Sequence, residues 1–522
     1  MAGHVRAAAA LAALSLAVLL CSPAAAGRAQ EPPAAPAPKE RAAGDATDDP
    51  LAPARQALRE GREEEAAELL RRRLTDVPGD DRTRYLLVRA LLALDDLAAA
   101  AESAEVARQE APDHALTFLA LADVMVRRGQ LAGAERFYRE AVRRDRELAW
   151  AHRGLGRMLE SQGERASALA AYRTAHELAP HEPALSLSLA TLTADPAERQ
   201  RLVRAAADDA EDPALQLRLA AALPLLAVLG DREPCRLVAA PESASLSMPE
   251  LDFHQRSLSG AVAGGREAPF LLDTGASGLL FDEKLAAKAG IEPVSPVELG
   301  GIGDWGSLTG ATAIAPEIAF GPLRFADCPI SIADTRFRIG ERGVVGADFF
   351  SDFVVHFDFA ADRLVLERLP VLVDGAGAPS LADRDLAARG AGWSPARLWY
   401  GDVLVQTRIN ASRTAWFVLD TGGQFNLLDR GLAAELVQLK RYTKLGLRGF
   451  SGEVQEVYQA QQRVTLSFAG LEQGNDGILA MDLSPLSSAV GLEIGGILGY
   501  ELLRHLDLGI DYRNALVRLR PR

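Results

Sequence analysis

The sequence predicts a multidomain protein in which an all-α solenoid of helical repeats precedes a mainly-β region of two lobes. Small residues recur every 34 positions between residues 53 and 228. After Gly230, short apolar runs punctuated by Gly and Pro replace the helical periodicity, and this β-rich part contains an internal duplication. A chain of 522 residues is too long for one ordinary domain, so two to four domains are expected.

Composition and charge narrow the functional classes. Hydrophobic residues make up 48% of the chain and charged residues 25%, which is typical of a globular protein and not of a disordered one. The net charge of -14, with no block of Lys and Arg, argues against a nucleic-acid partner. The eight His residues are scattered and form no His-Glu-x-x-His motif, so we expect neither a metal nor another cofactor.

Residues 1–26 have the pattern of a secretory signal peptide. His4 and Arg6 precede an apolar run over residues 7–20, and an Ala-x-Ala ending predicts cleavage after about Ala26. An uncleaved anchor is the alternative, but this run is short for a bilayer span. We therefore expect a periplasmic or extracellular protein with no membrane span in the mature chain.

The cysteines leave two questions open. Cys21 raises the alternative of a lipid-modified cysteine, but Leu20 precedes it where a lipoprotein signal usually has a small residue. Cys235 and Cys328 remain in the mature chain. An exported location permits a disulfide between them, and two isolated thiols are the alternative.

The helical part begins after a flexible Pro/Ala linker over residues 27–52 and extends over residues 53–228. Glycines at the turns between helices keep the same 34-residue step, with Asp95 in the one missing slot. A generic helical bundle would not hold one register across several features. The recurring positions are Ala66, Ala100, Ala134 and Ala168 within helices, and Gly61, Gly129 and Gly163 at turns.

This pattern resembles tetratricopeptide (TPR) repeats over roughly three and a half units. Such repeats stack into a curved solenoid whose inner face usually binds a partner peptide or protein. The resemblance therefore implies a module that recruits a substrate or a protein partner.

The duplication is visible when residue 270 is placed on residue 417, an offset of 147. This aligns Phe270-Leu-Leu-Asp-Thr-Gly with Phe417-Val-Leu-Asp-Thr-Gly, so each unit has an apolar strand that ends in an Asp-Thr-Gly turn. Further along, two apolar-apolar-Gly segments ending at Gly346 and Gly499 match at an offset of 153. We assign residues 229–370 to the first lobe and residues 371–522 to the second.

The paired motifs resemble the retropepsin-like and pepsin-like aspartic proteases, over approximately residues 250 to 522. In that family two lobes each contribute one catalytic Asp, which implies a dyad of Asp273 and Asp420. Two carboxyl groups close together share one proton, so one acts as a general base on water and the other as a general acid.

Other residues of the motifs are expected to support the two catalytic turns. The Thr hydroxyls can hydrogen-bond across the junction of the lobes, and the glycines let the backbone pass close to the carboxylates. The second lobe departs from the family pattern, because Gln424 stands where the first lobe has Ser277, whose hydroxyl usually supports the carboxylate. The supporting residues are Thr274, Gly275, Ser277, Thr421 and Gly422.

Each lobe should also cover the cleft with a Gly-rich hairpin, or flap. The candidates are residues 299–308, with Trp305 near the tip, and residues 445–453, with Phe450 near the tip. An ordinary β-turn with an exposed aromatic residue is the alternative for each.

The leading functional hypothesis is an exported aspartic endopeptidase with a TPR module for recruitment of a substrate or partner. The second hypothesis is a binding or scaffold protein whose protease lobes are weak or inactive, in line with Gln424. A third is a homodimer in which each Asp pairs with its own copy in the other subunit.

Overall fold

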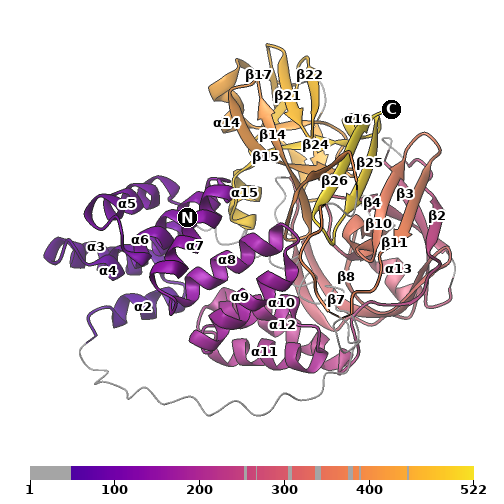
Figure 1. The fold of residues 1–522 in the computed structure, drawn as a ribbon. Helices are drawn as coiled ribbons and strands as arrows, with labels where there is room; N and C mark the ends of the chain where they lie inside the picture. The colour runs from indigo at the N-terminus through magenta and orange to yellow at the C-terminus, as the bar shows by residue number, and fades with distance from the viewer. Residues whose placement is uncertain are drawn as a thin grey trace.

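The computed structural model describes residues 49–251, 255–265, 267–303, 308–335, 343–373, 380–386, 390–443 and 446–522. Within these residues a helical array is followed by two β-rich lobes, as the sequence predicts (Figure 1). The expected signal peptide and the linker as far as residue 48 lie outside the described residues. In the described part of the chain, no helix combines the length and apolar character that a membrane crossing requires.

The helical array runs from residue 52 to residue 229 as antiparallel pairs joined by tight turns. Its helices are α2 (Ala52–Arg59), α3 (Glu63–Asp76), α4 (Asp81–Ala93), α5 (Leu97–Glu110), α6 (Ala115–Arg127), α7 (Leu131–Arg144), α8 (Ala149–Ser161), α9 (Arg165–Leu178), α10 (Pro183–Leu192), α11 (Pro196–Asp209) and α12 (Pro213–Leu229).

The 34-residue register is confirmed by burial and by backbone geometry. The four recurring alanines are fully buried, because a larger side chain would separate neighbouring helices. The turn glycines adopt positive φ angles of 68°, 69° and 80°. Asp95 takes the same left-handed conformation with φ 60°, which a short Asp side chain tolerates better than most residues.

The two ends of the array touch each other. Gln56 and Arg59 on α2 contact Glu211, which lies just before α12, with the Arg59 Nε to Glu211 Oε2 distance at 3.2 Å. The first turn also packs against the start of α12, since a Cβ on Gly61 would lie 3.0 Å from Asp212 Oδ1. The solenoid is therefore more strongly curved than an open stack of repeats.

The first lobe is built on an 8-stranded sheet with the order β1-β8-β5-β9-β4-β3-β7-β6. Its strands are β1 (Arg236–Ala239), β3 (Ser257–Val262), β4 (Glu267–Asp273), β5 (Leu279–Asp282), β6 (Ser295–Leu299), β7 (Leu308–Phe320), β8 (Leu323–Ala333) and β9 (Gly343–Gly346), with α13 (Glu283–Lys288) and the 3₁₀ turn η2 (Ala347–Phe350) between them. Aromatic side chains meeting edge to face, such as Phe270 with Phe281 and Phe320, fill its core.

The second lobe repeats this plan in a 10-stranded sheet. Its strands are β13 (Arg397–Trp399), β14 (Asp402–Ile409), β15 (Arg413–Asp420), β16 (Leu427–Asp429), β17 (Leu439–Arg441), β20 (Tyr458–Ala460), β21 (Val464–Phe468), β22 (Leu471–Asn475), β23 (Leu479–Met481) and β24 (Ile494–Gly499), with α14 (Arg430–Leu436), α15 (Ser484–Val490) and α16 (Tyr500–Leu503). A separate hairpin consists of β18 (Leu447–Gly449) and β19 (Gly452–Val454).

A six-stranded sheet joins the lobes, with the order β12-β26-β25-β10-β11-β2. Its strands are β2 (Ser243–Ser247), β10 (Phe353–Asp358), β11 (Arg363–Arg368), β12 (Trp393–Pro395), β25 (Leu506–Asp511) and β26 (Leu516–Pro521). Since β10 of the first lobe pairs with β25 of the second, backbone hydrogen bonds hold the lobes together.

The solenoid packs directly on both lobes. The α6–α7 turn meets the second lobe, where Trp416 Nε1 donates to Gly129 O at 2.7 Å and Glu493 N donates to Arg127 O at 2.9 Å. One apolar cluster continues from the solenoid into this lobe. On the other side α12 packs on β6 and β7 of the first lobe.

We expect Trp416→Phe to lower the free energy of unfolding by about 1 kcal/mol, because Gly129 O then loses its donor at this interface. Chemical denaturation of both proteins would measure the difference. Trp393→Phe is the matched control, since no hydrogen bond from Trp393 to the solenoid occurs in the described residues. An unchanged stability of Trp416→Phe would mean that this contact contributes nothing.

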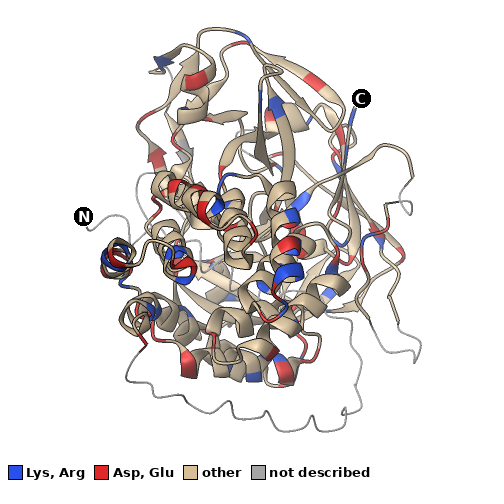
Figure 2. Ribbon diagram, turned by 60° about the vertical axis from the view of Figure 1, so that its left-hand side comes forward, with Lys and Arg blue, Asp and Glu red and all other residues tan. Residues whose placement is uncertain are grey.

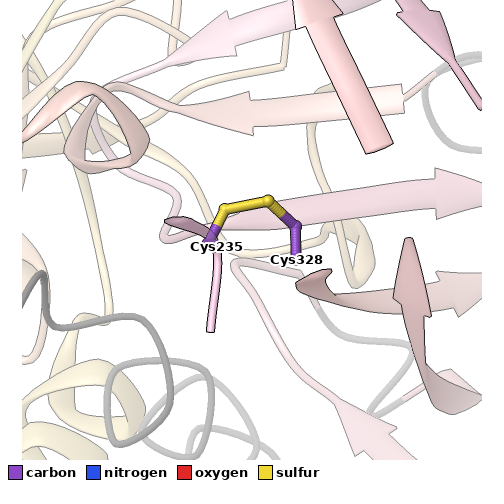
Figure 3. The surroundings of a disulfide bond; sticks show 2 residues. All are labelled: Cys235 and Cys328. Atoms are coloured by element: carbon purple, nitrogen blue, oxygen red, sulfur yellow. A yellow bond between two sulfur atoms is a disulfide. The ribbon is translucent and has the colours of Figure 1, made fainter. Parts of the chain in front are cut away.

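A disulfide bond joins Cys235 to Cys328, which resolves the question that the sequence left open (Figure 3). Cys328 is fully buried in β8, and Cys235 lies in the segment that follows α12. The bond therefore ties the end of the solenoid to the sheet of the first lobe.

Candidate active site

The two Asp-Thr-Gly turns occupy equivalent places in the two lobes. Asp273 ends β4, which pairs in parallel with β9, and it lies opposite Gly346. Asp420 ends β15, which pairs in parallel with β24, and it lies opposite Gly499. Each apolar-apolar-Gly segment therefore lies beside the Asp-Thr-Gly turn of its own lobe.

Cross-lobe hydrogen bonds of the two threonines hold the turns together. Thr274 N donates to Thr421 Oγ1 at 3.1 Å, and Thr421 N donates to Thr274 Oγ1 at 2.9 Å. The hydroxyls donate in turn to the opposite strands, from Thr274 to Leu419 O at 2.7 Å and from Thr421 to Leu272 O at 3.3 Å. All four groups are buried, so these bonds fix the separation of the two turns.

This arrangement places the two predicted catalytic carboxyl groups close together within one chain, because each Asp-Thr-Gly turn passes directly beside the carboxyl group of the other lobe. Gly275 N donates to Asp273 Oδ1 at 2.8 Å, and Gly423 N donates to Asp420 Oδ1 at 2.6 Å. Burial raises the pKa of both groups, and the neighbouring Asp420 charge raises that of Asp273 well above its usual range. The pair therefore holds one proton more readily than two separate carboxyl groups would.

Glycine is required where each turn passes the opposite carboxyl group. A Cβ on Gly422 would lie 2.3 Å from Asp273 Oδ2, and a Cβ on Gly275 would lie 2.9 Å from Asp420 Cγ. Real Cβ atoms do not approach other atoms at such distances. A larger residue at either position would therefore displace the turn or the carboxyl group beside it.

Ser277 has different partners from those that the resemblance implies. Its hydroxyl donates to Tyr400 O at 3.3 Å and also hydrogen-bonds with Asp348. In the residues that the structure describes, it makes no hydrogen bond to the carboxyl group of Asp273 or Asp420. Gln424 of the second lobe is engaged through its backbone, since Glu501 N donates to Gln424 O at 3.0 Å.

Two further carboxyl groups lie near the dyad, and the sequence reasoning missed both. Asp348 accepts from Gly278 N at 2.9 Å, and burial raises the pKa of Asp348 to about 6. The pKa of Asp402 is raised well above its usual range. Burial is the largest cause, and the negative charges of Asp420 and Asp348 add to it. Asp348 had one available signal, because the offset of 153 aligns it with an acidic residue, whereas Asp402 had none.

Gln255 is another supporting residue that the sequence reasoning missed. Its Nε2 donates to Gly422 O at 2.9 Å, so the first lobe supports the turn of the second. The offset of 147 places Gln255 on Asp402, a residue of another chemical type, so the duplication gave no signal for either position.

We expect Asp348→Asn to change how stability depends on pH. The folded pKa of about 6 exceeds the reference value of 3.8, so wild-type stability should fall as pH rises between these values and stay level above them. Asparagine does not titrate, so the variant should not lose this part of its free energy of unfolding. The loss in the wild type amounts to about 2–3 kcal/mol at neutral pH. Urea unfolding of both proteins at pH 4 and pH 7 would measure it, and parallel pH profiles would contradict the shifted pKa.

The structure describes the tip residue of one predicted flap and not that of the other. Trp305 lies outside the described residues, but its neighbours Gly301 and Ile302 are described. Phe450 lies at the turn of the β18–β19 hairpin, and a Cβ on Gly301 would lie 2.8 Å from its Cβ. Ser451 N donates to Ile302 O at 2.9 Å, so the segments from the two lobes meet.

The described residues contain no group of three or more His, Cys, Asp and Glu side chains that could hold a metal ion.

The two β lobes, the paired Asp-Thr-Gly turns and the preceding helical repeats define a protease-like protein of the aspartic class with a repeat module. A family model described as "Aspartyl protease" matches residues 258–349, which include the first Asp-Thr-Gly turn. The second turn lies beyond the matched residues and is related to the first by the internal duplication. The helical array is consistent with TPR repeats.

Among solved structures, the chain is similar to a thermophilic TPR protein of Thermus thermophilus. The two are 26% identical, and the match covers 33% of this chain and 97% of that chain with a TM-score of 0.29. No curated protein matches the chain.

Proposed function

We propose that the chain is an exported aspartic endopeptidase that hydrolyses peptide bonds at the Asp273–Asp420 dyad. The observation that carries this proposal is the close approach of the two carboxyl groups, held by the cross-lobe bonds of Thr274 and Thr421. Close approach within one chain supports one site per chain and not a homodimer with two sites.

In this mechanism the ionised member of the dyad accepts a proton from a water molecule, which attacks the peptide carbonyl. The protonated member then donates a proton to the leaving nitrogen. The rigid turns keep both carboxyl groups within reach of the same water, and the meeting hairpins limit entry of bulk solvent. Cleavage requires one shared proton, so activity should fall when the pair is fully ionised.

The experiment is a digest of a peptide library by the purified mature protein from acidic to mildly basic pH. We expect cleavage that a transition-state-mimicking inhibitor of aspartic proteases abolishes. A complete lack of cleavage across this range would favour the second candidate, a binding or scaffold protein with inactive lobes. The specific observation in favour of that candidate is Gln424 at the position of Ser277.

Export is part of the proposal and is supported by the N-terminal pattern and by the Cys235–Cys328 disulfide, since such bonds persist in oxidising compartments. Mass spectrometry of the mature protein should give an N-terminus at about Gly27. An N-terminal lipid on Cys21 would instead indicate the lipoprotein alternative.

A further inference from the structure

One side of the solenoid carries a cluster of arginines that the proposed dyad does not use. Helices α4, α6, α8 and α10 pack against one another in succession, which places them on the concave side of the array. The 34-residue register stacks Arg89, Asp123 and Arg157 at one position of three of these helices. Arg153 lies one helical turn before Arg157. We call Arg89, Arg153 and Arg157 the inner-face arginines.

Aromatic rings fix the inner-face arginines. The Cζ atom of Arg89 lies 4.0 Å from the ring centroid of Trp150, and that of Arg153 lies 5.4 Å from the same ring. Arg153 also donates to Ser188 Oγ at 3.0 Å. Within the described part of the chain, no hydrogen bond or ion pair holds the guanidinium of Arg89. Its donors therefore remain available to a ligand.

The inner-face arginines form a local surplus of positive charge. Their charges act on Asp123, which is half-buried and accepts from Tyr138 Oη at 2.6 Å, and that of Arg157 also acts on Glu160. Three guanidinium groups thus face two carboxyl groups in a chain whose net charge is -14. Elsewhere on the solenoid, acidic and basic residues are interspersed along the helices (Figure 2).

The cluster is connected to the catalytic turns by direct contacts. Arg157 Cζ lies 4.1 Å from the ring centroid of Trp399 and 5.2 Å from that of Tyr400, both in the second lobe. Tyr400 O accepts from the hydroxyl of Ser277 beside the first catalytic turn. A polypeptide bound along the inner-face arginines would therefore have its adjoining residues close to the dyad.

Arg157 already donates to Val490 O of the second lobe at 3.3 Å. We propose that the other two inner-face arginines, Arg89 and Arg153, bind an acidic segment of a polypeptide substrate and thereby present a neighbouring segment to the cleft. A guanidinium group donates two parallel hydrogen bonds to a carboxylate, and arginines held by aromatic rings lose little conformational freedom on binding. The delivery step rests on the proposed function, whereas the binding step does not.

The binding step is tested with the full chain carrying Asp273→Asn, so that the probe stays intact. The probe is a fluorescein-labelled peptide with a run of glutamates, and the reference peptide has glutamine at each of those positions. Fluorescence anisotropy should show that only the glutamate peptide binds, with an affinity that falls as salt is added. Equal binding of the two peptides, or binding of neither, would overturn the proposal.

The arginines are tested with Arg89→Gln/Arg153→Gln, which should weaken binding of the glutamate peptide at least tenfold. The matched control is Arg71→Gln/Arg136→Gln, which removes the same charge from exposed positions on α3 and α7 and should change the affinity less than twofold. An equal loss of affinity in both double variants would mean that only the overall charge of the protein matters, which would contradict the proposal. If the first double variant unfolds, the single variant Arg89→Gln is used for the same binding measurement. This variant should stay folded, because the Arg89 side chain makes no hydrogen bond in the described residues.

The delivery step is tested by the kinetics of the chain with an intact dyad. For a substrate with an acidic flank, Arg89→Gln/Arg153→Gln should raise KM and leave kcat unchanged. For the same substrate with glutamines in the flank, neither value should change. If no substrate is cleaved, the proposed function fails, but the anisotropy result still decides the binding step.

Discussion

Asp420→Asn should reduce kcat/KM for peptide cleavage by roughly 10²–10⁴-fold, and Asp273→Asn should do the same. In the proposed mechanism the two neighbouring carboxyl groups share one proton, so neither can supply both the acid and the base. Because they act as one unit, the double variant should be little worse than either single one. Initial rates on a peptide substrate, with the variants checked for unchanged folding, would measure this.

The control for charge loss is Asp476→Asn, an exposed carboxylate of the second lobe that pairs with Arg463. It should leave kcat/KM unchanged. Full activity in either dyad variant would refute a shared intramolecular site. The mass of the active protein, measured by sedimentation, adds a second check. Activity found only in a dimer would support the homodimer hypothesis instead.

The parts of the structure that the sequence predicts are those with a local signal repeated at a fixed step. Alanine at four positions 34 residues apart predicts close helix packing, and Asp95 fits a turn position where glycine otherwise stands. The dyad follows from the same logic, because duplicated strands of one lobe and the next must carry their Asp-Thr-Gly turns to equivalent places. Repetition is informative because chance seldom preserves a register.

Other features depend on contacts between distant segments and leave no such signal. Ser277 bonds to Tyr400 and Asp348, which no spacing could indicate. The burial of Asp402 depends on how the lobes close, and the Trp416 contact depends on where the solenoid docks. Each of these is decided by tertiary packing, which places a residue against partners that its own neighbours in sequence do not reveal.

The difference between the two Asp-Thr-Gly turns shows how a sequence signal and tertiary contacts can lead to different conclusions. The sequence shows that Gln424 replaces the serine of the first lobe, and it suggests a weaker second turn. In the structure, the turn at Asp420 is held by Gly423 N on its carboxylate and by Gln255 on Gly422 O. Neither bond uses the Gln424 side chain. The difference between the lobes therefore concerns the surroundings of Ser277 more than the support of Asp420.

Gly422→Ala should be the most damaging substitution that leaves every titratable group in place. The new methyl group would lie 2.3 Å from Asp273 Oδ2, so either the carboxyl group or the turn must shift. A displacement of about 1 Å at a catalytic group can cost on the order of 10²-fold in rate, and we expect a loss of at least this size in kcat/KM.

Gly79→Ala, in the turn between α3 and α4 of the solenoid, is the control, because a Cβ there would meet no atom of the described residues within 4 Å. It should leave kcat/KM unchanged, and any effect on stability should be small. Since the Gly422→Ala variant keeps both carboxyl groups, its loss of activity would show that the geometry of the dyad, and not only its charge, is required. Normal activity in this variant would mean that catalysis does not depend on the close approach of the second turn to Asp273.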